Sequence, residues 1–241
     1  MKKHLFVVLL VVYAGSGFAA SGHGPELLDA DVNLSNKTSL QRGARLFVNY
    51  CLSCHSARFM RYGRMADDLG IDQKIVEQSL MFASDKIGDT MTIAMRPSDA
   101  EGWFGVTPPD LSVIARARGA DWLYSFLNGF YLDSNRPTGV NNLYFPETAM
   151  PHVLGELQGY QVKQAAAGEG HQSVHLRLEQ SGRMSPGEYQ QATRDLVAFL
   201  AYLGEPAKLV RYRIGFWVIA FLLVLFVAVY LQKREYWKDV H

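Results

Sequence analysis

Cys51 and Cys54 are the two cysteines of this 241-residue chain, and His55 follows them directly. The pattern C-x-x-C-H is the attachment signature of c-type haem. Two thiolates at this spacing can add to the two vinyl groups of one porphyrin, and the adjacent imidazole can then bind the iron. The pattern therefore predicts one covalently attached haem c, with His55 as its proximal ligand.

Two further uses of a close cysteine pair fit this sequence poorly. A thiolate zinc site needs about four Cys or His ligands in matched pairs, and the chain has no second C-x-x-C. A thioredoxin-like redox pair opens a helix after a strand, whereas this pair closes a helical pattern. With both thiols bound to haem, no structural disulfide can form within the chain.

An electron-transfer haem usually keeps a second axial ligand, and a thioether raises its potential. Among eight methionines, Met184 stands immediately before a capped helix, and Met150 precedes Pro151 in a loop. Met184 is favoured because its helix is expected to cross the helix that carries the haem motif, and Met150 is the rival. A histidine ligand or an open sixth site is also compatible with the pattern. The histidine candidates are His152, His171 and His175.

The haem also needs further contacts that position it. A proximal imidazole normally donates its second N–H to a fixed acceptor, and a carbonyl in the turn at Pro108 and Pro109 could accept it. Partly buried propionates need cationic partners, which Arg116 or Arg118 could supply.

Two amphipathic helices are expected to hold the site. Residues 38–41 fit a capping box, and the apolar residues from 40 to 51 share one helical face that ends in the haem motif. Residues 185–188 fit a second capping box, and apolar residues then repeat at steps of three and four until Gly204 and Pro206 stop the helix. Gly43 suits a close crossing of these two helices.

The chain between these helices is rich in loops. Short helices are expected over residues 110–118 and 122–130. Alternation at residues 174–178 predicts a strand that pairs with residues 153–157 as a small β-hairpin. The predicted fold class is therefore mainly α, with a cytochrome c-type haem domain, long loops, one small β-hairpin and one C-terminal transmembrane helix.

Apolar runs lie at both ends of the chain. Lys2 and Lys3 precede a short run, and small residues at 17 and 19 predict a cleaved signal peptide over 1–19; a retained anchor is the competing hypothesis. Residues 214–231 carry no charge and are long enough to cross most of a bilayer core of about 30 Å. We therefore expect a periplasmic domain over 20–207, an anchor over 208–232 and a cytoplasmic tail over 233–241. The net charge of +1 argues against nucleic-acid binding.

The chain resembles the cytochrome c1 family, the haem subunits of the ubiquinol-cytochrome c oxidoreductase (cytochrome bc1) complex. The segments that carry the resemblance are residues 51–56, 61–62, 108–112, 116–118, 137–140, 142–145, 150–151, 184, 204–206 and 233–239. The resemblance implies thioether attachment at Cys51 and Cys54, axial ligation by His55 and Met184, pocket roles for Pro109 and Trp122, and propionate contact by Arg118. The chain lacks an extra cysteine pair that some bacterial members have.

The resemblance also implies a function. The chain would pass single electrons from the Rieske iron-sulfur protein to a soluble cytochrome c, next to cytochrome b in a dimeric complex of the bacterial inner membrane. It would be an electron-transfer subunit without acid-base machinery of its own. A haem subunit or shuttle of another respiratory enzyme is a second hypothesis, and a haem-based sensor or peroxidase is a third.

Overall fold

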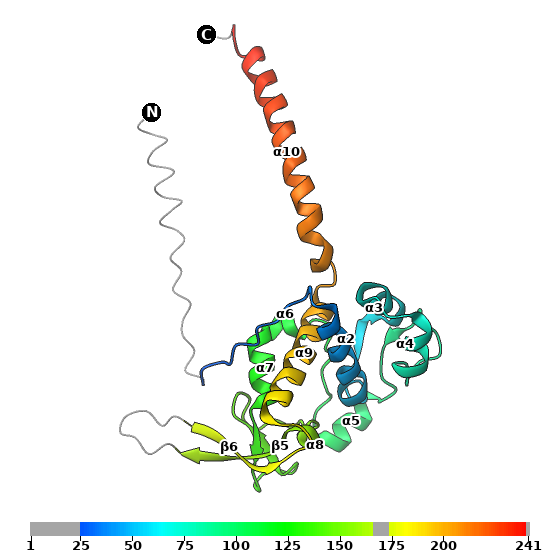
Figure 1. The fold of residues 1–241 in the computed structure, drawn as a ribbon, viewed down its shortest axis with the longest axis vertical. Coiled ribbons are helices and arrows are strands. Elements are labelled where there is room, and N and C mark those ends of the chain that lie inside the picture. The colour runs from blue at the N-terminus through cyan, green and yellow to red at the C-terminus, as the bar shows by residue number, and fades with distance from the viewer. Residues whose placement is uncertain (1–24, 166–173, 240–241) are drawn as a thin grey trace.

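The computed structural model describes residues 25–165 and 174–239, and Figure 1 shows a helical domain from which one long helix extends. The helical elements are α2 (Lys37–Leu46), the π-helical turn η1 (Phe47–Cys51), α3 (Tyr62–Leu69), α4 (Gln73–Ser79), α5 (Pro97–Phe104), α6 (Ile114–Arg118), α7 (Ala120–Asn128), α8 (Gly155–Gln158), α9 (Pro186–Gly204) and α10 (Lys208–Tyr236). The fold is mainly helical, as predicted. The predicted signal peptide over 1–19 lies outside the described residues.

The two predicted helices, α2 and α9, cross at the centre of the domain (Figure 1). Gly43 makes the close approach possible, because a Cβ atom built on it would overlap the carbonyl oxygen of Asp195. The Asp195 carboxylate is buried and accepts hydrogen bonds from Ser39 Oγ at 2.5 Å and from Arg42 Nη2 at 3.0 Å. A buried carboxylate thus ties the two helices together at their crossing.

Of the two predicted capping boxes, the structure contains the one at α9 but not the one at α2. Ser185 and Glu188 form the predicted capping box of α9, with the Ser185 N–H donating to Glu188 Oε2 at 2.8 Å. The capping box predicted over 38–41 is wrong: α2 begins at Lys37, and Asn36 Oδ1 accepts the Ser39 N–H at 3.1 Å. Asn caps a helix as well as Ser or Thr does, so the upstream residue caps α2.

Strands in the described residues pair into three two-stranded antiparallel sheets, so the structure has more β structure than the one predicted hairpin. The pairs are β1 (Ala57–Arg61) with β2 (Thr90–Met91), β3 (Phe130–Leu132) with β4 (Val140–Asn142), and β5 (Gly159–Ala165) with β6 (Val174–Ser181). The predicted partner of β6, residues 153–157, is wrong, because that segment forms a turn and the start of α8. Gly159, with φ +88°, follows the last residue of α8 and is the first residue of β5.

The helix predicted over 110–118 begins only at Ile114. Asp110 prevents an earlier start, because its side chain accepts the Ser112 N–H at 2.9 Å and holds residues 110–112 in a turn. The helix predicted over 122–130 is α7, which begins two residues earlier and ends at Asn128.

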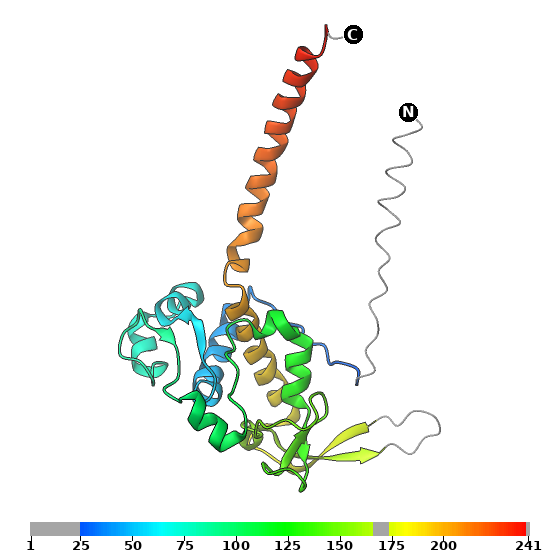
Figure 2. The same cartoon turned by 180° about the vertical axis from the view of Figure 1, so that it is seen from behind.

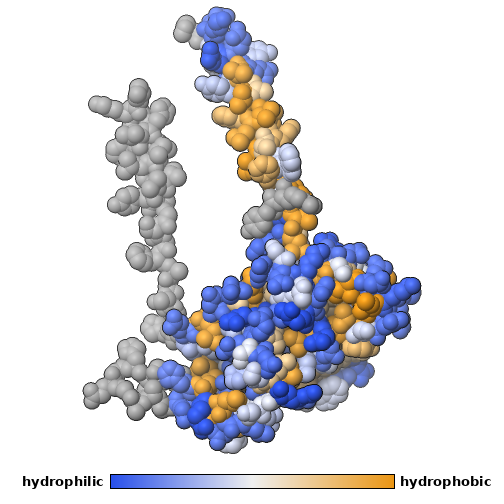
Figure 3. All heavy atoms as spheres, in the orientation of Figure 1, coloured by the Kyte–Doolittle hydropathy of each residue, from blue (hydrophilic) through white to orange (hydrophobic). Residues whose placement is uncertain are grey.

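Helix α10 leaves the domain just after α9 and extends away from it, as seen from both sides in Figures 1 and 2. Its segment Ile214–Tyr236 is long and apolar enough to cross a membrane, and the other described residues do not cover it. Figure 3 shows apolar residues along the middle of this helix and polar ones toward its C-terminal end. The expected C-terminal membrane helix is therefore present.

Candidate haem site

The haem motif stands where a regular helix changes its winding. α2 runs into η1, in which the Leu52 N–H donates to the Phe47 carbonyl at 2.9 Å, five residues back. The Cys51 carbonyl then accepts from the N–H groups of Cys54 at 3.0 Å and His55 at 2.8 Å. Single π-turns in helices are frequent at functional sites. Here the turn ends at the first residue of the motif.

The two thiols differ in exposure. Cys51 is buried, and Cys54 is partly exposed. Burial, followed by the neighbouring Cys54, raises the pKa of the Cys51 thiol to about 12. Because the thiolate is the reactive form, a free Cys51 in the folded chain is a weak nucleophile at neutral pH.

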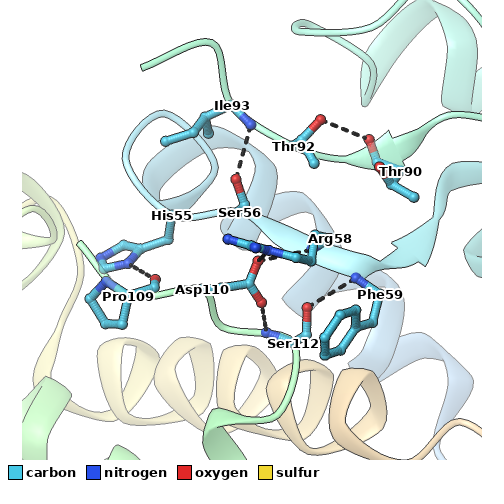
Figure 4. A network of polar contacts seen from close by, with 10 residues as sticks. All are labelled: His55, Ser56, Arg58, Phe59, Thr90, Thr92, Ile93, Pro109, Asp110 and Ser112. Carbon is cyan, nitrogen blue, oxygen red and sulfur yellow. Dashed lines mark hydrogen bonds and ion pairs between the residues drawn. The ribbon is translucent and has the colours of Figure 1, made fainter. Parts of the chain in front are cut away.

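His55 is held in one orientation by the loop that follows α5. Its Nδ1–H donates to the Pro109 carbonyl at 2.8 Å, the contact shown in Figure 4. Burial lowers the pKa of the imidazole, although this hydrogen bond and the charge of Asp110 act in the opposite direction. The ring is therefore neutral at pH 7, and Nε2 is the nitrogen left to bind a metal. The acceptor is the one that the sequence suggested.

Asp110 fastens this loop to the chain that leaves the motif (Figure 4). Its carboxylate accepts from both the backbone N–H and Nε of Arg58, at 3.1 and 3.0 Å. Ser112 Oγ accepts the Phe59 N–H at 3.1 Å, and the Ser56 carbonyl accepts the Leu111 N–H at 2.8 Å. Burial acts to raise the pKa of Asp110, but the hydrogen bonds from Ser112 and Arg58 outweigh it and lower the pKa. The position of the Pro109 carbonyl is thus set by the contacts of the residues that follow it.

Both cysteines and His55 line a cavity of about 450 Å³. This volume lies within the range of about 300–1,000 Å³ that is typical of cofactor sites. Most of the wall is apolar and comes from segments far apart in the sequence. The apolar lining residues include Phe104, Val106, Leu111, Ile114, Leu123, Phe126, Leu127, Phe145, Val153, Leu196 and Leu200.

Arg118 and Trp122 also line the cavity. Trp122 stacks on Phe126 with ring centroids 5.2 Å apart, and its ring stands edge-on to Phe145. The guanidinium of Arg118 lies 5.0 Å from the centroid of Trp122, and its side chain is exposed. No carboxylate pairs with Arg118 within the part of the chain that the structure describes. An exposed cation therefore stands at the edge of an aromatic wall.

The two methionine candidates differ in position. Met150 lines the cavity. Met184 is not among the lining residues; it is half-buried against the hydrophobic core, and its N–H donates to the Leu157 carbonyl at 3.0 Å. Of the histidine candidates, His152 and His175 are not on this wall, and His171 lies outside the described residues. Ligation by Met184 remains a prediction.

Several lining residues were not predicted from the sequence. Phe126 lies on α7, a helix that was predicted without a role at the haem, and Leu196 and Leu200 lie on a helix that was predicted only to cross α2. Phe145 and Val153 lie in a loop and a turn outside the regular elements. The contacts of Asp110 had a local signal, because Asp two residues before Ser is typical of a side-chain-to-backbone turn.

The residues at this site fit a covalently bound haem c. Two thiols and a neutral imidazole share one wall of an apolar cavity, and the imidazole already uses Nδ1 for the Pro109 carbonyl. Within residues 25–165 and 174–239 no cluster of three or more His, Cys, Asp or Glu could hold a metal ion by itself.

A helical domain with this cavity, followed by an exposed apolar helix, has the architecture of a membrane-anchored c-type cytochrome. The Cytochrome C1 family profile matches residues 31–169 and 180–240. The chain is 47% identical to a cytochrome c1 of Allochromatium vinosum and 45% identical to a protein named ammonia monooxygenase gamma subunit of Nitrosomonas europaea, each over the full length of both chains. It is also 25% identical to a cytochrome c1 of Rhodospirillum rubrum, over all of this chain and 98% of the relative.

The chain belongs to the cytochrome c1 family. Members of this family carry covalently bound haem c and transfer electrons in respiration, so the chain is a respiratory electron-transfer haem protein. The resemblance seen in the sequence is thereby confirmed.

Proposed function

We propose that the chain is the haem subunit of a cytochrome bc1 complex, where it accepts single electrons from the Rieske iron-sulfur protein and passes them to a soluble cytochrome c. The observation that carries the proposal is the neutral His55 imidazole, held by Pro109, on the wall of an apolar cavity that both thiols also line. The full-length similarity to a cytochrome c1 supports the same complex, with cytochrome b as the membrane partner.

Each predicted site residue has a proposed task. Cys51 and Cys54 form the thioethers, and His55 binds the iron through Nε2. Pro109 holds the imidazole, Trp122 forms part of the pocket wall, and Arg118 supplies positive charge for a propionate at the rim. Bound haem supplies one-electron redox chemistry. The protein excludes water from the cavity with its apolar walls and keeps His55 in one orientation.

For the second axial ligand we propose Met184, as the family resemblance implies. Met184 precedes Ser185, the cap residue of α9, and Leu196 and Leu200 of this helix reach the cavity. Met150 lines the cavity itself and is the rival. Met184→Ala should lose the methionine-to-iron charge-transfer band of the ferric protein and bind CO in the ferrous protein, with the haem still attached. Met150→Ala is the matched comparison and should keep the wild-type spectrum. The opposite result would assign the ligand to Met150.

We further propose the topology that the sequence suggested. A signal peptide over 1–19 would export the domain over 20–207 to the periplasm, α10 would anchor it in the bacterial inner membrane over 208–232, and residues 233–241 would remain in the cytoplasm. The apolar segment of α10 supports the anchor. Basic residues flank both ends of this segment, so the exported N-terminal part decides the orientation. The dimeric state of the complex is proposed from family resemblance.

Purification of the full-length chain from native membranes in mild detergent tests the proposal. We expect cytochrome b and the Rieske protein to co-purify, and we expect added quinol to reduce the haem c of the preparation. A matched preparation from cells that lack the Rieske protein should keep the haem c but lose its quinol-driven reduction. Quinol reduction at an unchanged rate without the Rieske protein would contradict the proposed electron donor.

A second candidate function is a haem subunit of a different oxidoreductase. It is favoured by one observation, the 45% identity to the relative named ammonia monooxygenase gamma subunit. The same purification separates the two candidates, because co-purification with another oxidoreductase, and without cytochrome b, would support the second.

A further inference from the structure

We infer that Asp110 lowers the reduction potential of the haem, as a positioning residue that holds the Pro109 carbonyl and places a negative charge behind the proximal imidazole. The inference rests on the proposed haem site. Asp110 does not line the cavity, so it acts through Pro109 and His55 and not by contact with the haem. Partners of this kind orient a ligand and tune the metal that it binds.

The Asp110 carboxylate is held on both of its oxygens. Oδ2 accepts from the backbone N–H and from Nε of Arg58, at 3.1 and 3.0 Å, and Oδ1 accepts the Ser112 N–H at 2.9 Å. Its side chain is only 19% exposed. The carboxylate is therefore fixed in place, one residue after the carbonyl that accepts the His55 hydrogen bond.

The Asp110 carboxylate is one of the contacts that hold the loop around Pro109 in position. Pro108 and Pro109 have no N–H groups, so these two residues cannot donate hydrogen bonds to the rest of the domain. Figure 4 shows Asp110 between the Pro109 loop and Arg58, which belongs to the strand that follows the haem motif. His55 and its acceptor Pro109 lie 54 residues apart in the chain. The contact between Asp110 and Arg58 therefore connects the segment of the haem motif with the loop that holds its imidazole.

The negative charge of Asp110 determines the direction in which the reduction potential shifts. Ferric haem carries one more positive charge than ferrous haem, and a nearby anion stabilises the form with more positive charge. Asp110 directly follows Pro109, whose carbonyl accepts the hydrogen bond from His55 Nδ1, so its charge lies on the proximal side of the site. Arg58 opposes it, but the Arg58 side chain is 62% exposed and more strongly screened by solvent. The net effect favours the ferric form.

A purely structural role for Asp110 would have the opposite sign. If the side chain only fastened the loop, its replacement would loosen the cavity and admit water. Water around the haem stabilises the ferric charge, which lowers the potential. The direction of the shift therefore distinguishes an electrostatic role from simple fastening.

Three variants of the full-length, haem-loaded protein test the inference: Asp110→Asn, Arg58→Gln and Asp110→Glu. The matched control is Asp99→Asn in α5, because Asp99 pairs with Arg96 in an exposed ion pair and does not line the cavity. Spectroelectrochemical titration at pH 7 measures the midpoint potential. Haem staining after denaturing electrophoresis reports attachment, and urea unfolding reports how firmly the loop is held.

We expect Asp110→Asn to raise the midpoint potential, because it removes the negative charge. We expect Arg58→Gln to lower the midpoint potential, because it removes the positive charge that partly neutralises Asp110. Asp110→Glu should lie closer to wild type than Asp110→Asn, and Asp99→Asn should be unchanged. A lower or unchanged potential in Asp110→Asn overturns the inference, and so does a rise in Arg58→Gln. If Asp110→Asn does not accumulate, a lower potential in Arg58→Gln without a loss of urea stability supports the inference, and any other result for Arg58→Gln overturns it.

Failure of this inference and failure of the proposed function look different. If the potentials move in the wrong direction while the wild-type haem is still attached and reduced by quinol, only the inference fails. If the wild-type chain carries no covalent haem, both fail together.

Discussion

Replacing Gly43 by Ala should destabilise the protein at the crossing of α2 and α9. A Cβ atom at this position would overlap the Asp195 carbonyl oxygen and lie 2.7 Å from Cβ of Phe199. The carbonyl belongs to the backbone of α9, so it cannot rotate away, and the two helices would have to separate. Overpacking in a core costs about 1–3 kcal/mol, and we take about 3 kcal/mol because a backbone atom is involved.

The gain in helix propensity opposes this cost only in part. Ala in a helix interior is more stable than Gly by about 0.5–1 kcal/mol, which leaves a net loss of about 2 kcal/mol. For a chain of this size, about 2–4 °C of melting temperature is lost per kcal/mol, so Tm should fall by about 4–8 °C.

Thermal unfolding of the detergent-solubilised, haem-loaded protein, followed by far-UV circular dichroism, measures this shift. The matched control is Gly102→Ala in α5, where a Cβ atom meets nothing within 4 Å. The control should have an unchanged or slightly higher Tm. A Gly43→Ala protein as stable as wild type would refute the reasoning, because it would mean that the helices can separate without cost.

Two further predictions concern Asp110 and the anchor. Asp110→Asn should lower the free energy of unfolding by about 1 kcal/mol at pH 7, because its charge-assisted bonds to Arg58 are lost. The folded pKa of Asp110 is lowered, so its stabilisation is present above the unfolded value of about 4 and is lost as the pH falls through the folded pKa. Urea unfolding at pH 7 and pH 3 should therefore show a difference between wild type and variant that shrinks at pH 3; an equal difference at both would contradict the assignment. A chain that ends at Ala207 should remain in the supernatant after ultracentrifugation without detergent and keep its haem spectrum, since the apolar segment of α10 is not covered by the domain. The full-length chain should sediment with the membranes, and sedimentation of the shortened chain would mean that another surface holds it there.

The elements that the sequence predicted well are those specified by local patterns. C-x-x-C-H requires no tertiary information, and α9 has a capping box, a regular apolar period and a terminating Gly204 within one short stretch. The start of α2 was misplaced because Asn36 and Thr38 are both acceptable caps, and only the hydrogen bond to Ser39 distinguishes them. The close approach of the two helices was predicted from one glycine, Gly43, within the helix that leads to the haem motif.

The wall of the haem site could be predicted only in part. The carbonyl of Pro109 was found because proline rigidifies a turn and a proximal imidazole needs an acceptor. Phe145 and Met150 belong to a loop that Asn141 and Arg136 hold through hydrogen bonds to the backbone of Glu147. A loop has no periodic sequence pattern from which its position at the cavity could be predicted. The partner of β6 was missed because residues 155–158 form α8 and the strand begins only at Gly159, and the sequence pattern alone allowed the earlier segment.

The long sequence separation between the cavity walls has a consequence for the order of assembly during synthesis. The thiols lie at positions 51 and 54, but Leu196 and Leu200, near the end of the domain sequence, complete the wall. Contacts over such separations form late, since the intervening chain must be made and ordered first. In the folded domain the Cys51 thiol is buried and weakly reactive. We therefore expect covalent attachment to be chemically easiest before the last segments of the cavity wall have docked.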